Sequence, residues 1–237
     1  AVLIGVNKYP DSPLRNCVND TESINKLLSN HYSSFSSIIL KDSNAAKENV
    51  LKYLSAEIES LKSDDILYIL YSGHGSQVPN RHDAWESDGL DEVLCPFFKE
   101  FSISAFITDD EILDLFSKKH PNSVIVFLAD CCHSGDIGRT VRIHPNQRNK
   151  FLEMPEWLKK IFSQDKSLKL KSYDYSLQNV VILSACNTRE TAADGGINST
   201  GEEIKNGKFT YEIIESLLAN PNQNFEQLIA DLQTRCR

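Results

Sequence analysis

The stretch "DILYILY" at residues 65–71 decides the fold, because it is apolar at almost every position. A strand with one face in water alternates apolar and polar residues, whereas a strand covered on both faces is apolar throughout. Other short strand-like runs occur at residues 1–6 ("AVLIGV"), 36–40 ("SSIIL"), 123–129 ("SVIVFLA") and 179–185 ("NVVILSA"). Together these runs predict five strands, most of them buried on both faces.

Segments with helical periodicity lie between and after these strands. They cover residues 21–32, 47–61, 108–119, 209–220 and 225–236. Thr108 and Glu111 have the spacing of a capping box, and Asn19 or Asp20 is placed to cap the first helix. Strands that alternate with helices predict an α/β fold, with a mainly parallel sheet flanked by helices on both faces.

Length and composition limit the function classes. The 237 residues fit one α/β domain or two small ones, and the net charge of −8 argues against general nucleic-acid binding and suits a cationic partner. No apolar run approaches the roughly 18 residues of a membrane span, and no signal peptide is visible. Six cysteines are sparse for this length, which favours reduced thiols and a cytoplasmic location. The chain begins directly in a strand-like run, which is typical of an excised or processed domain.

The carboxyl ends of the predicted strands carry the polar motifs. Ligands of open α/β sheets bind beyond these ends, which nominates residues 7–20, 72–77, 130–136 and 186–190. In this set, His74 lies three residues past Tyr71, and Cys132 lies three residues past Ala129. If the two strands are neighbours, both side chains project from the same edge of the sheet.

A cysteine and a histidine at one edge suggest nucleophilic catalysis. A thiol needs a nearby base to become a thiolate at neutral pH, and histidine can take that proton and return it to a leaving amine. The N–H groups of Gly75 and Cys132 are candidates for holding an oxyanion. A buried inert thiol and a structural histidine are the alternatives. Zinc binding by Cys131, Cys132 and His133 is a third, but adjacent cysteines rarely reach one ion.

The motifs "YSGHGSQ" and "DCCHSGD", with Cys132 58 residues after His74, resemble the metacaspase branch of the caspase-like cysteine peptidases. The resemblance implies a caspase-like fold, with Cys132 as the nucleophile, His74 as general acid and base, and Cys131 at a variable position. It implies a monomer whose single domain spans 1–237. Within it, a large-subunit-like part (1–136) precedes a basic linker (137–178) and a small-subunit-like part (179–237).

The same resemblance implies cleavage of proteins or peptides after Arg or Lys. The positions that match the family's acidic pocket are Asp20, Ser72 and Asp130. Carboxylates in a partly dry pocket pair with a guanidinium or an ammonium and reject an acidic side chain. Asp20 is also explained as a helix cap, and the two roles are compatible.

Calcium is implied as an activator, although the chemistry itself requires no cofactor. The matching acids are Asp91, Asp109, Asp110 and Asp136. Clustered carboxylates from different loops are suitable calcium ligands. Asp109 and Asp110 also stand where acidic residues favour the start of a helix, so spacing alone does not decide between the two interpretations.

Two alternative functions stay open. The segment "SACNTRE" has Thr188 and Glu190 where metacaspases commonly carry an acid and an amide, so a caspase-fold peptidase of different specificity is one alternative. A catalytically silent scaffold or sensor that binds basic segments is another. The basic linker contains several residues after which self-cleavage would suit the implied specificity, and the sequence does not select one of them. These are Arg139, Arg142, Arg148, Lys150 and several later lysines.

Overall fold

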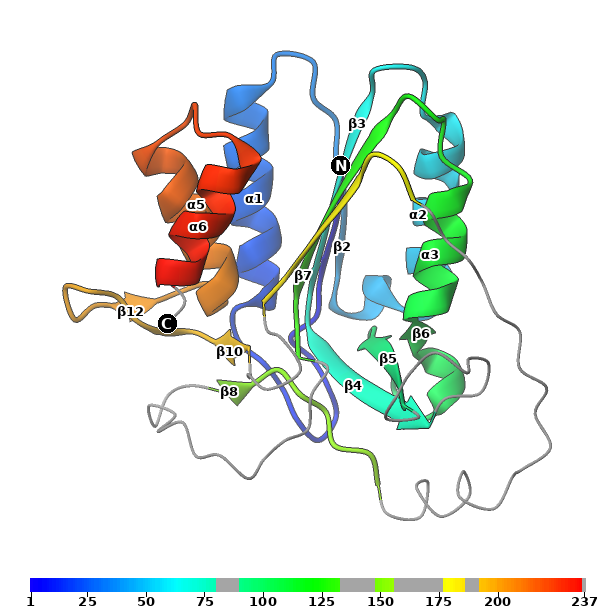
Figure 1. Ribbon diagram of the computed structural model, residues 1–237. Coiled ribbons are helices and arrows are strands. Elements are labelled where there is room, and N and C mark those ends of the chain that lie inside the picture. The colour runs from blue at the N-terminus through cyan, green and yellow to red at the C-terminus, as the bar shows by residue number, and fades with distance from the viewer. Residues whose placement is uncertain (80–89, 133–147, 156–176, 186–191, 236–237) are drawn as a thin grey trace.

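The computed structural model describes residues 1–79, 90–132, 148–155, 177–185 and 192–235. Its centre is a sheet of five parallel strands in the order β2-β1-β3-β7-β9 (Figure 1). The strands are β1 (Val2–Gly5), β2 (Ile38–Lys41), β3 (Ile66–Ser72), β7 (Val124–Asp130) and β9 (Val180–Ser184). The five strands predicted from the sequence are therefore confirmed, as is the mainly parallel sheet.

Helices cover both faces of this sheet, as predicted (Figure 1). One face carries α1 (Cys17–His31), α5 (Lys208–Ala219) and α6 (Phe225–Arg235), and the other carries α2 (Lys47–Ser60) and α3 (Asp109–Ser117). Alternate strand residues enter two separate cores: Leu70 packs with the α1 and α5 side, whereas Ile69 packs with the α2 and α3 side. This alternation follows from the two-residue repeat of a strand.

The register of the sheet aligns the ends of three strands. Ser72, the last residue of β3, is the partner of Gly5 in β1 and of Asp130 in β7. Because the strands are parallel, their carboxyl ends meet at one edge. His74 and Cys132 each follow one member of the Ser72–Asp130 pair by two residues, so both begin at the same place on this edge.

Short strands outside the main sheet were not predicted. Strands β4 (His74–Pro79), β5 (Leu90–Cys95) and β6 (Ile107–Thr108) form an antiparallel sheet at the carboxyl edge. Between the last strand of the main sheet and α5 lies a small ladder of β11 (Gly196–Ile197) and β12 (Glu203–Ile204). Strand β8 (Arg148–Asn149) pairs with β10 (Ala193–Asp194). Single turns of 3₁₀ helix occur at η1 (Asp42–Ala45) and η2 (Ile103–Ala105).

The predicted start of the first helix is wrong by four residues. Helix α1 begins at Cys17, so Asp20 lies in its first turn and is not its cap. Its first N–H groups are satisfied by side chains from elsewhere: Asn7 Oδ1 accepts from Cys17 N at 2.9 Å, and Asp194 accepts from Asn16 N at 3.0 Å. The capping box of Thr108 and Glu111 at α3 is confirmed. Among the described helices, none combines the length and apolarity needed to cross a bilayer.

Candidate active site

The three residues predicted for the acidic pocket lie together. Asp20 comes from α1, Ser72 from the end of β3 and Asp130 from the end of β7, and all three are fully buried. The Ser72 hydroxyl donates to Asp20 Oδ2 at 2.6 Å. Two carboxylates therefore face a small polar space that is closed to water.

The side chain of Lys150 fills this space. Its ammonium lies 2.8 Å from Asp130 Oδ1 and 3.5 Å from Asp20 Oδ2, and it donates to Ser72 Oγ at 3.0 Å. The solvent-exposed fraction of the Lys150 side chain is 0%. A basic side chain of this protein thus occupies the pocket predicted to receive a basic side chain of a substrate.

Gly207 forms a wall of the pocket and was not anticipated from the sequence. A Cβ at this position would lie 2.3 Å from Asp130 Oδ2 and 2.4 Å from Lys150 Nζ. The Gly207 N–H also donates to Asp20 Oδ1 at 2.8 Å. On the other carboxylate, Oδ2 of Asp130 accepts from the Thr210 hydroxyl at 2.6 Å. The loop before α5 and its first turn therefore fix both acids and leave room for the ammonium.

Burial and charge act in opposite directions on these groups. Burial alone would lower the pKa of Lys150, but the carboxylates of Asp130 and Asp20 hold that pKa well above its ordinary value. Burial raises the pKa of Asp20 to about 6, although the Lys150 ammonium opposes the shift. The pocket therefore holds a protonated amine firmly, and Asp20 loses its proton near pH 6.

His74 is buried at the start of β4 with one ring nitrogen engaged. Its Nε2 lies 2.7 Å from the carbonyl oxygen of Ser12, which can only accept, so Nε2 carries the proton of the neutral ring. Nδ1 is buried and has no hydrogen-bond partner among the described residues. Burial lowers the pKa of His74, while Ser12 and the adjacent main chain of Lys150 oppose this shift. The ring is therefore neutral at pH 7, with Nδ1 available to accept a proton.

Two buried tyrosines hold His74 in position. The Tyr9 hydroxyl accepts from His74 N at 2.9 Å and donates to the Cys95 carbonyl at 2.7 Å. The Tyr71 hydroxyl donates to the His74 carbonyl at 2.7 Å. A Cβ at Gly73 would lie within 2.8 Å of both hydroxyls, so glycine serves here to make space for the tyrosines.

Cys132 follows the end of β7 by two residues and is fully buried. Its sulfur is 3.6 Å from the carbonyl oxygen of Ala192, and the Ala192 N–H donates to it. The same carbonyl oxygen accepts from the N–H of Lys150 at 3.1 Å. Cys132 and Lys150 are therefore brought together by one residue, Ala192.

The main chain around Lys150 is bound on both sides. Before it, Arg148 and Asn149 pair with Asp194 and Ala193 in an antiparallel ladder. The carbonyl oxygen of Lys150 accepts from the N–H of Gly75 at 2.9 Å. Gly75, predicted as an oxyanion donor, thus already donates to the peptide that follows the basic residue.

The predicted calcium ligands are only partly described. Asp109 and Asp110 begin α3, where Asp109 Oδ1 accepts from Asp110 N at 3.0 Å. Asp136 and the side chain of Asp91 lie outside the described residues, as do His133, Thr188 and Glu190. Within the ranges given above, no group of three or more His, Cys, Asp or Glu side chains is arranged to hold a metal ion. Calcium binding therefore stays a prediction.

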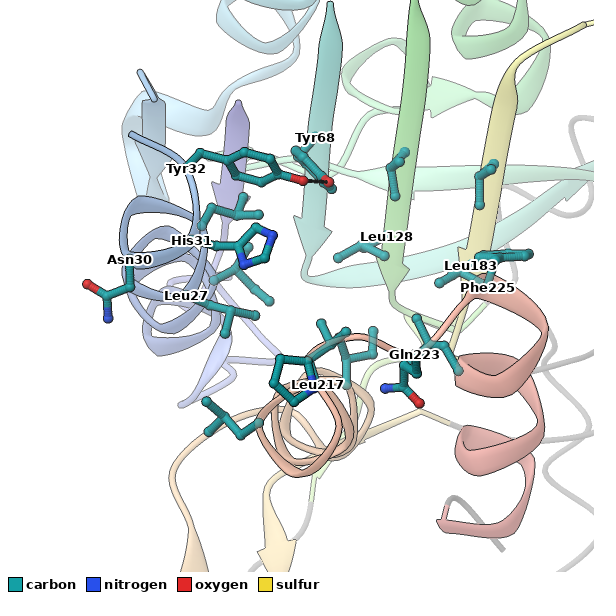
Figure 2. Close-up of a pocket in the computed structure, with 18 of the residues that line it drawn as sticks. Leu27, Asn30, His31, Tyr32, Tyr68, Leu128, Leu183, Leu217, Gln223 and Phe225 are labelled. Atoms are coloured by element: carbon teal, nitrogen blue, oxygen red, sulfur yellow. Dashed lines mark hydrogen bonds between the residues drawn. The ribbon is translucent and has the colours of Figure 1, made fainter. Parts of the chain in front are cut away.

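A second cavity, of about 460 Å³, lies on the face of the main sheet (Figure 2). Leu27 from α1, Leu128 from β7, Leu183 from β9 and Leu217 from α5 are among the side chains that form its walls. Its walls are mainly aliphatic, and neither His74 nor Cys132 lines it. The chemistry-bearing residues therefore lie at the carboxyl edge, away from this cavity.

Comparison with known proteins identifies the family. The family model for the metacaspase, peptidase C14 domain matches residues 1–140. The chain belongs to this family. The matched range includes both motifs that suggested the resemblance, and it includes His74 and Cys132. Lys150 and Gly207 lie beyond it.

Several metacaspases are similar along most of the chain. Metacaspase-1 of Candida albicans is 26% identical over 98% of this chain and 61% of its own length. Metacaspase-4 of Arabidopsis thaliana is 34% identical over 58% of this chain and 34% of its own. The chain thus spans about three-fifths of the length of relatives such as the Candida metacaspase. A crystal structure of a Geobacter sulfurreducens protein has the same fold, with a TM-score of 0.72, 22% identity, and coverage of 99% of this chain and 87% of the other.

Proposed function

We propose that the chain is a cysteine endopeptidase that cleaves proteins after Lys or Arg, and that the Lys150–Phe151 peptide is its first substrate. The observation that supports this most strongly is the placement of Lys150. Its side chain lies between Asp20 and Asp130, and its carbonyl oxygen accepts from Gly75 N. A substrate residue before a scissile bond would need both contacts.

The reaction begins with proton transfer from the Cys132 thiol to Nδ1 of His74. The thiolate attacks the carbonyl carbon of the residue in the acidic pocket, and the carbonyl electrons move to oxygen. Gly75 N–H, together with Cys132 N–H, stabilises that oxyanion. The carbon–nitrogen bond breaks, His74 returns the proton to the leaving amine, and a thioester remains on Cys132. Water then hydrolyses the thioester and regenerates the thiol.

The preference for a basic residue follows from the pocket. Asp20 and Asp130 present two carboxylates in a space without solvent, and Ser72 adds an acceptor. An ammonium or a guanidinium satisfies these groups, whereas an acidic side chain would meet two like charges. Thr188 and Glu190 follow the fifth strand in the sequence and depart from the family's pattern, so we expect them to alter the usual subsite preferences.

The intact chain is therefore self-inhibited. A substrate cannot enter the acidic pocket while Lys150 fills it, and cleavage of the bond after Lys150 is the step that allows the segment to leave. Of the two basic linker residues that the structure describes, Arg148 and Lys150, it is Lys150 whose ammonium lies between the two pocket carboxylates and whose carbonyl oxygen accepts from Gly75 N.

Intact-mass spectrometry of the purified chain, with and without calcium, tests this proposal. We expect fragments 1–150 and 151–237 from the wild type and from Lys150→Arg, and the uncut mass from Lys150→Ala and Cys132→Ala. Arg148→Ala is the matched control and should still be cut after Lys150. Cleavage at another bond with Lys150→Ala unaffected would contradict the assignment of the first substrate.

A fluorogenic Arg or Lys peptide and an Arg chloromethylketone test the activity in trans. Turnover of the basic peptides and covalent labelling of Cys132 are expected after self-cleavage. Preferential turnover of an Asp peptide would instead favour a caspase-fold peptidase of different specificity. If the chain neither cleaves the peptides nor reacts with the chloromethylketone, the second candidate is favoured, a catalytically silent scaffold that binds basic segments. The buried position of Lys150 between two carboxylates is also consistent with such binding.

Calcium stimulation forms a separate part of the proposal. The argument for it is the set of four acids that match the family, of which Asp109 and Asp110 share the first turn of α3. We expect a chelator to slow self-cleavage and added calcium to restore it. Asp109→Asn should reduce the response to calcium, and an unchanged rate in a chelator would remove calcium from the proposal.

A further inference from the structure

The segment that follows Lys150 also enters the protein in a regular pattern. Leu152 and Met154 are only 8% and 7% exposed, whereas Phe151 between them is partly buried and Glu153 is exposed. Alternate burial is typical of an extended chain lying on a surface, with every second side chain directed inward. Lys150, Leu152 and Met154 are therefore the three side chains of this segment that the protein encloses.

The edge of β4 binds the main chain at Leu152. The Leu152 N–H donates to the Gly75 carbonyl at 2.9 Å, and the Ser76 hydroxyl donates to the Leu152 carbonyl at 2.6 Å. These bonds use main-chain groups that every residue except proline carries. They place the residue that comes second after the Lys150–Phe151 bond without depending on its side chain.

The side chain of Leu152 meets an apolar surface. It packs in the same core cluster as Val78, Phe98 and Phe106. Leu152 also borders a cavity of about 510 Å³, which Tyr9, Phe98 and Phe101 line as well. Aromatic rings from the segment after β5 thus form a wall beside the edge of β4.

We propose that this surface is a subsite that selects a large aliphatic side chain at the second residue after the scissile bond. The inference rests on the proposed function, because it takes the contacts of residues 150–154 as those of a bound substrate. A leucine at this position loses contact with water on binding, which favours it over a small residue. A carboxylate there would lose its hydration among aromatic and aliphatic groups.

The protein would thus select its substrates at two positions, by different physical means. The acidic pocket recognises one residue before the cut by charge, and the β4 subsite recognises one residue two places after it by apolar area. Substrates of this enzyme are then expected to carry the pattern of a basic residue, any residue, and a large aliphatic residue. Glu153 marks a position that the protein does not enclose, so substitutions there should have little effect.

Quenched fluorescent peptides test the subsite without changing the protein. The parent peptide carries the sequence Arg-Asn-Lys-Phe-Leu-Glu-Met, taken from residues 148–154, and the enzyme is the full chain after self-cleavage. One variant replaces Leu by Asp, a second replaces Leu by Ala, and a matched control replaces Glu by Ala. A Lys-aminocoumarin reporter, which has no residues after the cut, measures the activity independently of this subsite.

We expect kcat/KM to fall at least about tenfold for Leu→Asp and less steeply for Leu→Ala, since burial of a leucine side chain is worth a factor of this order. The Glu→Ala control should change kcat/KM by less than about twofold. Equal rates for all four peptides, with the reporter cleaved, would overturn the subsite and leave the proposed function standing. Failure to cleave the reporter and every peptide would overturn the proposed function, and the subsite with it.

Discussion

The ammonium of Lys150 lies 2.8 Å from the carboxylate of Asp130, and both side chains are completely excluded from solvent. Such a pair exists only because each charge compensates the other, since an isolated buried charge is strongly unfavourable. The acidic pocket therefore requires a cation in the folded chain. Any substrate that replaces Lys150 must supply an equivalent cation.

Removal of this cation should destabilise the fold. On a Cys132→Ala background, which prevents self-cleavage, we expect Lys150→Ala to lower the free energy of unfolding by about 3–5 kcal/mol, because two carboxylates are left buried. Lys150→Arg keeps the positive charge and should lower the free energy of unfolding by a smaller amount. Urea denaturation monitored by circular dichroism measures both. Equal stability of the Ala and Arg variants would show that the charge pair does not hold the segment.

Substitution of the two adjacent cysteines should have very different effects on kcat. Cys132→Ala is expected to reduce kcat by at least about 10³-fold, as loss of a nucleophile does in other peptidases. Cys131 packs in the apolar core, and Cys131→Ala should retain activity. Turnover of a Lys-aminocoumarin reporter distinguishes them. The nucleophile assignment fails if Cys131→Ala is inactive and Cys132→Ala is not.

Gly207→Ala should close the acidic pocket. The backbone at Gly207, with φ of −57° and ψ of 143°, accepts any residue, so the effect is one of space. A methyl group would lie 2.4 Å from the position of Lys150 Nζ. We expect loss of self-cleavage and a rise of at least about tenfold in KM for Lys peptides. Lys205→Ala, an exposed position in the same loop, is the control, and similar kinetics for both variants would contradict this role.

Tyr9 is expected to act as a positioning residue. In Tyr9→Phe, the His74 N–H loses its buried partner, which costs roughly 1–3 kcal/mol where water cannot replace it, whereas the Cys95 carbonyl still has the Tyr71 hydroxyl at 2.6 Å. We predict a kcat lowered by about tenfold with KM nearly constant, because the acidic pocket is untouched. Tyr53→Phe on α2 provides the control. A rise in KM at constant kcat would point to substrate binding instead.

The raised pKa of Asp20 predicts a pH dependence for basic ligands. With an ammonium in the pocket the pKa of Asp20 is about 6, and without it the pKa is higher, because Lys150 lowers it. Affinity for an ammonium should therefore weaken as pH falls from neutral to about 6, and change little below. A peptide aldehyde ending in Lys tests this against one ending in norleucine. The ratio of their inhibition constants cancels the titration of His74, and a pH-independent ratio would exclude Asp20 as the cause.

The sequence was sufficient for the features that depend on neighbouring residues along the chain. The apolar runs predicted all five strands of the main sheet, and the spacing of Thr108 and Glu111 predicted the start of α3. The rule for carboxyl ends placed Ser72 and Asp130 at one edge, and the register confirms that they are neighbours. The motif match then supplied Asp20 from a helix that no periodicity connects to that edge.

Other features depend on contacts between distant segments. The start of α1 is held by Asn7 and Asp194, the latter 178 residues away from Asn16, so no local cap could reveal it. Lys150 is one basic residue among many in the linker, and a ladder of two residue pairs positions it. Gly207 lies in a segment for which the sequence analysis predicts neither a strand nor a functional role. In each case the deciding contact joins segments that lie far apart in the sequence.

The ladder between β8 and β10 has a consequence for the timing of activation. Arg148 and Asn149 pair with Asp194 and Ala193, and the main chain of Leu152 hydrogen-bonds Gly75 and Ser76, so none of these contacts depends on the peptide bond after Lys150. Scission alone leaves two new chain ends seated where they were. Activity toward other substrates should then appear after a lag, whose length is set by the dissociation of these ends. Until they dissociate, the cleaved segment acts as a product inhibitor of the enzyme.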